Sequence, residues 1–163
     1  MPGLYYEEFE IGKVITHTLS RTVTETDNLL FTSLCMNNSP LHLSEKFCQD
    51  QTIWGQRLVT SAFTIGLVMG MSVADTVEGT SLGNLGIDGI TFPNPVFIGD
   101  TIRAESVITN RRRSASRPKT GIVTFVHRGF NQKDQQVIEI TRKGLSMCLY
   151  ENDDEAQRGT PRA

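Results

Sequence analysis

Apolar and polar residues follow two different periods along this chain, and the change between them divides it into a helical part and a β part. Residues 13–23 are rich in β-branched side chains, which predicts a first strand. A short helix should follow over 24–35, because its first residue is a capping threonine and leucines recur behind it. Pro40 interrupts this pattern within a polar turn over 36–41, since proline disfavours helical geometry in the residue before it. A second short helix is expected over 44–50.

The most apolar stretch of the chain predicts the main helix, over about 61–77. Apolar side chains surround this segment almost completely, so we expect it to be buried. Gly66 and Gly70 fall four residues apart on one face, where a strand or a second helix would approach closely. The apolar run is shorter than the roughly 20 residues that span a bilayer, so no membrane association is expected.

From Thr80 onward the period becomes strand-like. Four candidate strands, joined by short turns, lie near 82–92, 100–113, 119–131 and 135–149. Short turns between consecutive strands favour an antiparallel meander. We therefore predict one α+β domain over 1–150, in which an antiparallel sheet curls around the long buried helix, and a disordered tail over 151–163. Pairing of open sheet edges predicts a homodimer or a larger assembly of dimers.

The composition narrows the classes of partner and of chemistry. A net charge of −2 over 163 residues argues against nucleic acid as a general partner. The odd number of cysteines (three), without paired spacing, predicts reduced thiols and a cytoplasmic location, and the N-terminus has no signal-peptide pattern. No CxxC or HExxH spacing occurs, so no metal site is expected.

Three short segments carry the candidate chemistry. The first is Met36-Asn37-Asn38-Ser39-Pro40-Leu41-His42, a polar turn that ends in a histidine. The second is Gln56-Arg57-Leu58-Val59-Thr60-Ser61, which enters the main helix. The third is Phe92-Pro93-Asn94-Pro95-Val96-Phe97-Ile98-Gly99-Asp100. Histidine suits proton transfer because this side chain ordinarily titrates near neutral pH, so the first segment predicts a place where water is bound and deprotonated.

Together these segments resemble the MaoC-like hydratases, a family of hot-dog proteins that includes the R-specific enoyl-CoA hydratases. The first segment is similar to the family's Gly-Asp-x-Asn-Pro-Leu-His, the second to Gly-Arg-Pro-Ile-Val-His-Gly and the third to Phe-x-x-Pro-Val-Phe-x-Gly-Asp. The resemblance covers residues 4 to about 149. It implies a hot-dog fold, a CoA or acyl-carrier thioester substrate, reversible addition of water to its α,β double bond, a dimer, and no metal or redox cofactor. The first segment looks like members that handle mesaconyl-, itaconyl- or methylmalyl-type thioesters.

Carried over residue by residue, the resemblance makes His42 the acid/base. Asn37 stands where the family has its aspartate, and an amide can hold a water but cannot take its proton. Either His42 performs both proton transfers, or a carboxylate such as Glu45 or Asp27 substitutes, or turnover is lost. Asp27 is more simply read as part of a helix cap, and Glu45 as a surface residue in the first turn of a helix.

Further candidates concern substrate binding. Ser61 and Ala62 should open the main helix, and their backbone N–H groups could bind the thioester oxygen as an oxyanion hole. Ser39, Arg57 and Arg117 are candidate substrate contacts: Arg57 for an acyl carboxylate, and Arg117 for CoA phosphates unless its turn is merely solvated. Two rival functions stay open, a hot-dog thioesterase, which would need a carboxylate or nucleophile on the main helix, and a catalytically silent CoA-binding subunit.

Overall fold

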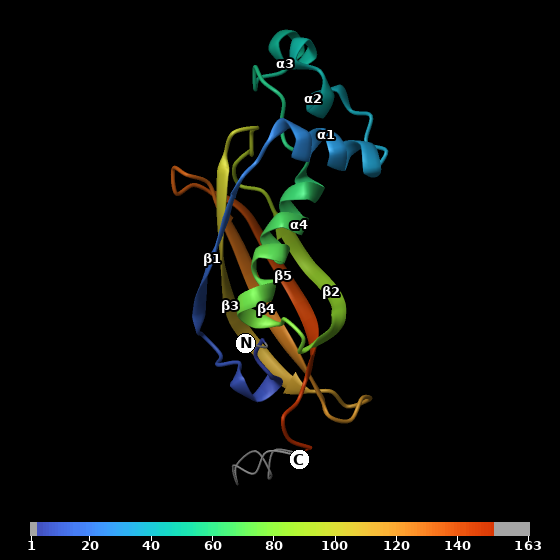
Figure 1. Ribbon diagram of the computed structural model, residues 1–163, viewed down its shortest axis with the longest axis vertical. Coiled ribbons are helices and arrows are strands. Elements are labelled where there is room, and N and C mark those ends of the chain that lie inside the picture. Colours follow the sequence, from blue (N-terminus) through green and yellow to red (C-terminus); the bar gives the residue numbers. More distant parts are fainter. Residues whose placement is uncertain (1–2, 152–163) are drawn as a thin grey trace.

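A computed structural model describes residues 3–151, so the predicted tail lies outside the described residues apart from Glu151. Five strands form one antiparallel sheet, and their bounds follow the sequence pattern closely (Figure 1). The strands are β1 (Val14–Thr22), β2 (Ser81–Thr91), β3 (Thr101–Arg113), β4 (Thr120–Phe130) and β5 (Gln136–Met147). The predicted α+β hot-dog architecture is therefore confirmed.

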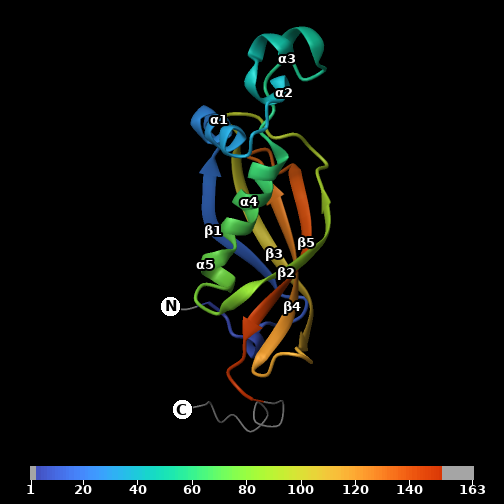
Figure 2. The ribbon, with the colours of Figure 1, turned by 90° about the vertical axis from the view of Figure 1, so that its right-hand side faces the viewer.

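The helices divide into a cluster at one end of the sheet and a helix that lies along its inner face (Figures 1 and 2). A 3-10 turn, η1 (Tyr6–Glu8), precedes β1. The helices are α1 (Glu25–Leu34), α2 (Pro40–Leu43), α3 (Glu45–Gln51), α4 (Ser61–Met71) and α5 (Val73–Thr76). Among the described residues no helix is long and apolar enough to cross a membrane.

The strand order is β1-β3-β4-β5-β2, so the expected meander is right for β3, β4 and β5 but wrong for β2. β2 pairs with β5 at the opposite edge of the sheet from β1. Residues 92–100 therefore cross the end of the sheet to reach β3 (Figure 1). Such a crossing passes two interior strands, about 15 Å at the usual strand spacing, which nine residues can span.

The main helix is shorter and less enclosed than the sequence predicts. It ends at Met71, where the Ser72 hydroxyl donates to the Met69 carbonyl (2.7 Å) and competes with the helical hydrogen-bond ladder. Val68 and Met71 are buried against the sheet, but Gly66 and Gly70 are exposed. A Cβ added at either glycine would meet nothing within 4 Å. The expected close approach at these glycines is therefore absent within residues 3–151.

A continuous row of polar side chains crosses the buried face of the sheet and ends on α5. Arg142 Nε donates to His127 Nε2 (2.7 Å), and His127 Nδ1 lies 2.5 Å from Ser106 Oγ. Ser106 Oγ lies 2.7 Å from His17 Nε2, and His17 Nδ1 lies 3.0 Å from Asp75 Oδ2. Because arginine can only donate, His127 Nε2 must accept the Arg142 hydrogen bond, which leaves the ring proton on Nδ1. His127 therefore donates from Nδ1 to Ser106, and the row links the buried Arg142 guanidinium to the Asp75 carboxylate.

Candidate functional site

The turn that carries the candidate histidine is built from backbone and amide hydrogen bonds. Met36 adopts a left-handed conformation (φ 55°) that ends α1, and the Asn37 N–H donates to the Thr32 carbonyl (2.9 Å). Asn37 Oδ1 accepts the Ser39 N–H (3.2 Å), as asparagine commonly does in tight turns. The structure differs from the predicted plain turn because α2 starts at Pro40, a position where a helix tolerates proline.

His42 has one of its two ring nitrogens fixed by the backbone. Nδ1 lies 2.9 Å from the Leu58 carbonyl oxygen, which can only accept, so Nδ1 carries the proton. Nε2 of the neutral ring is therefore the nitrogen that can accept a proton. Within residues 3–151 no carboxylate is hydrogen-bonded to this ring. The arrangement is suited to a base that acts without a carboxylate partner.

The start of α4 supplies backbone donors beside this histidine segment. Thr60 is the N-cap, and its carbonyl accepts from the Phe63 (3.1 Å) and Thr64 (3.3 Å) N–H groups. Ser61 and Ala62 are the first two helical residues, as the sequence predicts, and both are exposed. N–H groups at such positions have no acceptor inside the helix and can bind an oxyanion.

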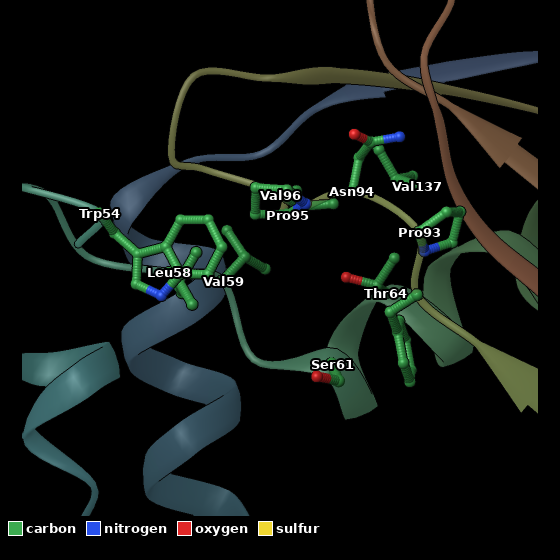
Figure 3. Close-up of a pocket in the computed structure, with 11 residues that line it drawn as sticks. Trp54, Leu58, Val59, Ser61, Thr64, Pro93, Asn94, Pro95, Val96 and Val137 are labelled. Carbon is green, nitrogen blue, oxygen red and sulfur yellow. The ribbon is translucent and has the colours of Figure 1, made fainter. Parts of the chain in front are cut away.

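A pocket of about 230 Å³ opens beside the first turn of α4 (Figure 3). Its walls are mainly apolar and come from the loop before α4, from α4 itself, from the β2–β3 connection and from β5. The lining residues are Trp54, Leu58, Val59, Ser61, Thr64, Phe92, Pro93, Asn94, Pro95, Val96 and Val137. Among the residues that the structure describes, no ionisable side chain lines this pocket, which suits a short, uncharged acyl group.

Hydrogen bonds join the histidine turn to the loop before α4, and that loop to the wall of the pocket. The Leu58 N–H donates to the Leu41 carbonyl (3.2 Å), and the Val59 N–H donates to the Val96 carbonyl (2.9 Å). Asn28, on α1 and 1% exposed, donates from Nδ2 to the His42 carbonyl (3.0 Å) and accepts the Thr60 N–H at Oδ1 (3.1 Å). The histidine turn and the start of α4 are thus joined through a third element.

Arg57 and both candidate carboxylates are engaged elsewhere. Arg57 Nε lies 2.9 Å from Glu45, and Nη1 lies 2.9 Å from Glu25. The hydrogen bond to Glu25, and after it the one to Glu45, raises the pKa of the guanidinium. Asp27 accepts from the Thr24 N–H (2.9 Å) in a capping box, which confirms its expected role. The Thr24 and Arg21 hydrogen bonds lower the pKa of Asp27, so it is ill suited to accept a proton.

The basic turn between β3 and β4 lies at the opposite end of the sheet from α1–α3 (Figure 1). Arg111 donates to the Tyr6 and Glu7 carbonyls, and Arg113 pairs with Glu7 (3.0 Å), so these two arginines fasten the N-terminal segment. Arg117 is exposed at the tip of the turn. The predicted contact of Arg117 with CoA phosphates and that of Arg57 with an acyl carboxylate stay predictions. So do the roles of His42, Asn37, Ser39, Ser61 and Ala62.

Two participants gave no signal in the sequence. The Leu58 carbonyl, which orients His42, is a backbone group, and backbone groups leave no trace in a motif. Asn28 is a polar residue in front of the apolar stripe of α1, and only its burial and its two distant partners distinguish it.

The chain matches the family model described as MaoC like domain over residues 8–129. It is 34% identical to the β-methylmalyl-CoA dehydratase of Chloroflexus aurantiacus over 142 residues, 86% of this chain and 39% of that protein. It is 29% identical to the mesaconyl-CoA hydratase of Cereibacter sphaeroides, over 86% of this chain and 40% of that protein. The chain thus spans about two fifths of the length of these curated relatives.

Among solved structures, a protein of Mycobacterium tuberculosis described as having a double hot-dog fold superposes with a TM-score of 0.79. The match is 19% identical in sequence and covers 90% of this chain and 44% of that protein, so it establishes the fold alone. The family model covers most of the chain, and the first relative exceeds 30% identity over most of it. The chain therefore belongs to the MaoC-like family of hot-dog proteins.

Proposed function

We propose that this chain is a hydratase that reversibly adds water across the α,β double bond of an enoyl-CoA thioester. The observation that carries this proposal is the fixed tautomer of His42, held through Leu58 beside a pocket that opens at the first turn of α4. The names of the curated relatives support the same reaction class. The reaction is redox-neutral, with water as the only co-reactant.

The proposed mechanism uses one base on one face of the substrate. The acyl chain lies in the pocket, and the thioester oxygen accepts from the Ser61 and Ala62 N–H groups. His42 Nε2 takes a proton from water as the oxygen bonds to Cβ, and the resulting enolate is stabilised by the helix amides. The imidazolium then returns the proton to Cα, so protons and charge balance within one turnover.

Incubation with crotonyl-CoA and with mesaconyl-CoA tests this proposal and its rivals. Loss of the enoyl absorbance without release of free thiol is expected for crotonyl-CoA. Thiol release would instead indicate a thioesterase, and binding of CoA without any turnover would indicate a silent subunit. Within the described residues α4 carries no acidic side chain, and Asp75 on α5 is bound to His17, which disfavours the thioesterase.

The acyl specificity is the finer part of the proposal. The pairing of Arg57 with Glu25 and Glu45 and the uncharged pocket favour a neutral short acyl group over the dicarboxylic groups named for the relatives. A kcat/KM at least about tenfold higher for crotonyl-CoA than for mesaconyl-CoA is expected, since an unpaired carboxylate is costly to bury. The reverse preference would mean that Arg57 or a second copy supplies a cation.

Replacing Asn37 by aspartate is expected to raise kcat about tenfold or more. A carboxylate at this position can still accept the Ser39 N–H, as Asn37 Oδ1 does, and it can also take a proton. Steady-state kinetics of Asn37→Asp, with Asn38→Asp as the control on an exposed neighbour, measures the change. A fall in kcat confined to Asn37→Asp would show that the amide Nδ2 donor is needed.

We further propose that the chain acts in the cytoplasm as a homodimer. β2 is an edge strand with exposed apolar side chains at Leu82, Leu85 and Ile87, and the glycine face of α4 is open. A second copy paired along β2 would cover these three side chains, and only such a copy could bring an Arg117 toward this site. Three free cysteines suit a reducing compartment. Sedimentation equilibrium should give twice the 18.1 kDa mass of one chain.

A further inference from the structure

Asn28 is a buried side chain whose two hydrogen-bond partners belong to the two halves of the candidate site. Its Nδ2 donates to the carbonyl of His42, the proposed base, and its Oδ1 accepts from Thr60, the N-cap of the helix that supplies the proposed oxyanion donors. The side chain is 1% exposed, so neither bond is exchanged for one to solvent. We propose that Asn28 is a positioning residue that sets the separation of the base from the oxyanion site; this inference rests on the proposed hydratase function.

The two hydrogen bonds of Asn28, to the His42 carbonyl and from the Thr60 N–H, form a bridge that requires an amide. One end must donate to a carbonyl oxygen and the other must accept an N–H, and among short side chains only asparagine offers both in one plane. Aspartate keeps the acceptor for Thr60 but places a second acceptor against the His42 carbonyl. Leucine has a similar size but neither function, so it leaves two buried backbone groups without their partner.

The Asn28 bridge matters because the other connections reach the loop before α4, whereas Asn28 reaches Thr60, the N-cap of α4 itself. His42 Nδ1 is bonded to the Leu58 carbonyl, which lies in the loop two residues before Thr60. That loop is also fastened to Leu41 by the Leu58 N–H, to the β2–β3 connection by Val59 and Val96, and to α1 by the exposed pair of Arg57 with Glu25. Asn28 alone among these contacts runs directly from the His42 backbone to the first turn of α4. A displacement of about 1 Å between reacting groups can cost on the order of 100-fold in rate.

The kinetic test uses Asn28→Asp and Asn28→Leu with crotonyl-CoA. We expect kcat per folded molecule to fall about 10- to 100-fold, with KM changed less than about twofold, because binding groups stay in place while reacting groups shift. The matched control is Asn131, a buried asparagine whose hydrogen bonds stay within its own turn, to Lys133 and Gln135. Asn131→Asp and Asn131→Leu should lower the melting temperature without changing kcat. Equal kcat losses at both positions would overturn the proposal.

A readout without turnover separates this inference from the proposed function. In wild-type protein the Thr60 amide proton should exchange slowly, and the ¹⁵N signals of the His42 ring should indicate a protonated Nδ1. In Asn28→Leu the Thr60 proton should exchange at least about tenfold faster, and the ring signals should shift. If the wild type does not hydrate enoyl-CoA, the function fails, while these signals still test the bridge. Unchanged exchange and ring signals in both variants would refute the bridge itself.

Discussion

Replacing His42 by asparagine is expected to lower kcat for hydration by about 10²- to 10⁴-fold, the usual contribution of a general acid–base group. The Nδ2 of asparagine lies near the position of the imidazole Nδ1, so the variant can still donate to the Leu58 carbonyl. It lacks any group at the position of Nε2. The loss should therefore appear in turnover, and the melting temperature should change little.

His42→Ala provides the comparison that separates the two functions of the ring. It removes both nitrogens, so we expect the same loss of kcat together with a loss of stability of about 1 kcal/mol for the hydrogen bond to Leu58. Stopped-flow measurement of the enoyl absorbance and thermal unfolding supply the two readouts. Hydration that persists in both variants would mean that another group moves the proton.

The second large effect concerns stability at acidic pH. The pKa of His127 is lowered from 6.5 to about 3, mainly because the ring is buried. The charges of Arg142 and His17 lower it further. The folded state therefore binds a proton less readily than the unfolded state. The stabilising contribution is complete above the unfolded value and is lost as pH falls from about 6.5 toward 3. The full difference of about 3.5 units corresponds to about 5 kcal/mol, and the slope near pH 5 to about 1.4 kcal/mol per pH unit.

The variant His127→Gln isolates this contribution, because the remaining titratable groups are common to both proteins. Glutamine can accept from Arg142 and donate to Ser106, but it does not titrate. Urea denaturation at several pH values between 7 and 4.5 should give a shallower decline of the unfolding free energy for the variant. Parallel curves for the two proteins would show that His127 has the same pKa in the folded and unfolded states.

Short-range patterns in the sequence predict where the helices and strands lie, but not which strands pair with one another. The cap at Thr24 and the bounds of the strands follow from residues only a few positions apart, so they are readable from the chain. The placement of β2 beside β5 is not, because the turn residues at 92–100 are compatible with either a hairpin or a crossing. The exposure of the glycine face of α4 is likewise not readable from the chain, since an apolar segment does not reveal which of its sides a single chain covers.

The candidate site shows the same division. The sequence by itself determined the family and the start of α4, because a motif preserves residue types at fixed spacing, and it singled out His42 as the candidate base. Only the tertiary structure decided which ring nitrogen of His42 is protonated, that Arg57 pairs with two glutamates, and that Asn28 joins two elements. Those partners lie 12 to 32 residues apart along the chain. A buried polar group takes whichever partner the fold brings within reach, and short-range patterns carry no record of that choice.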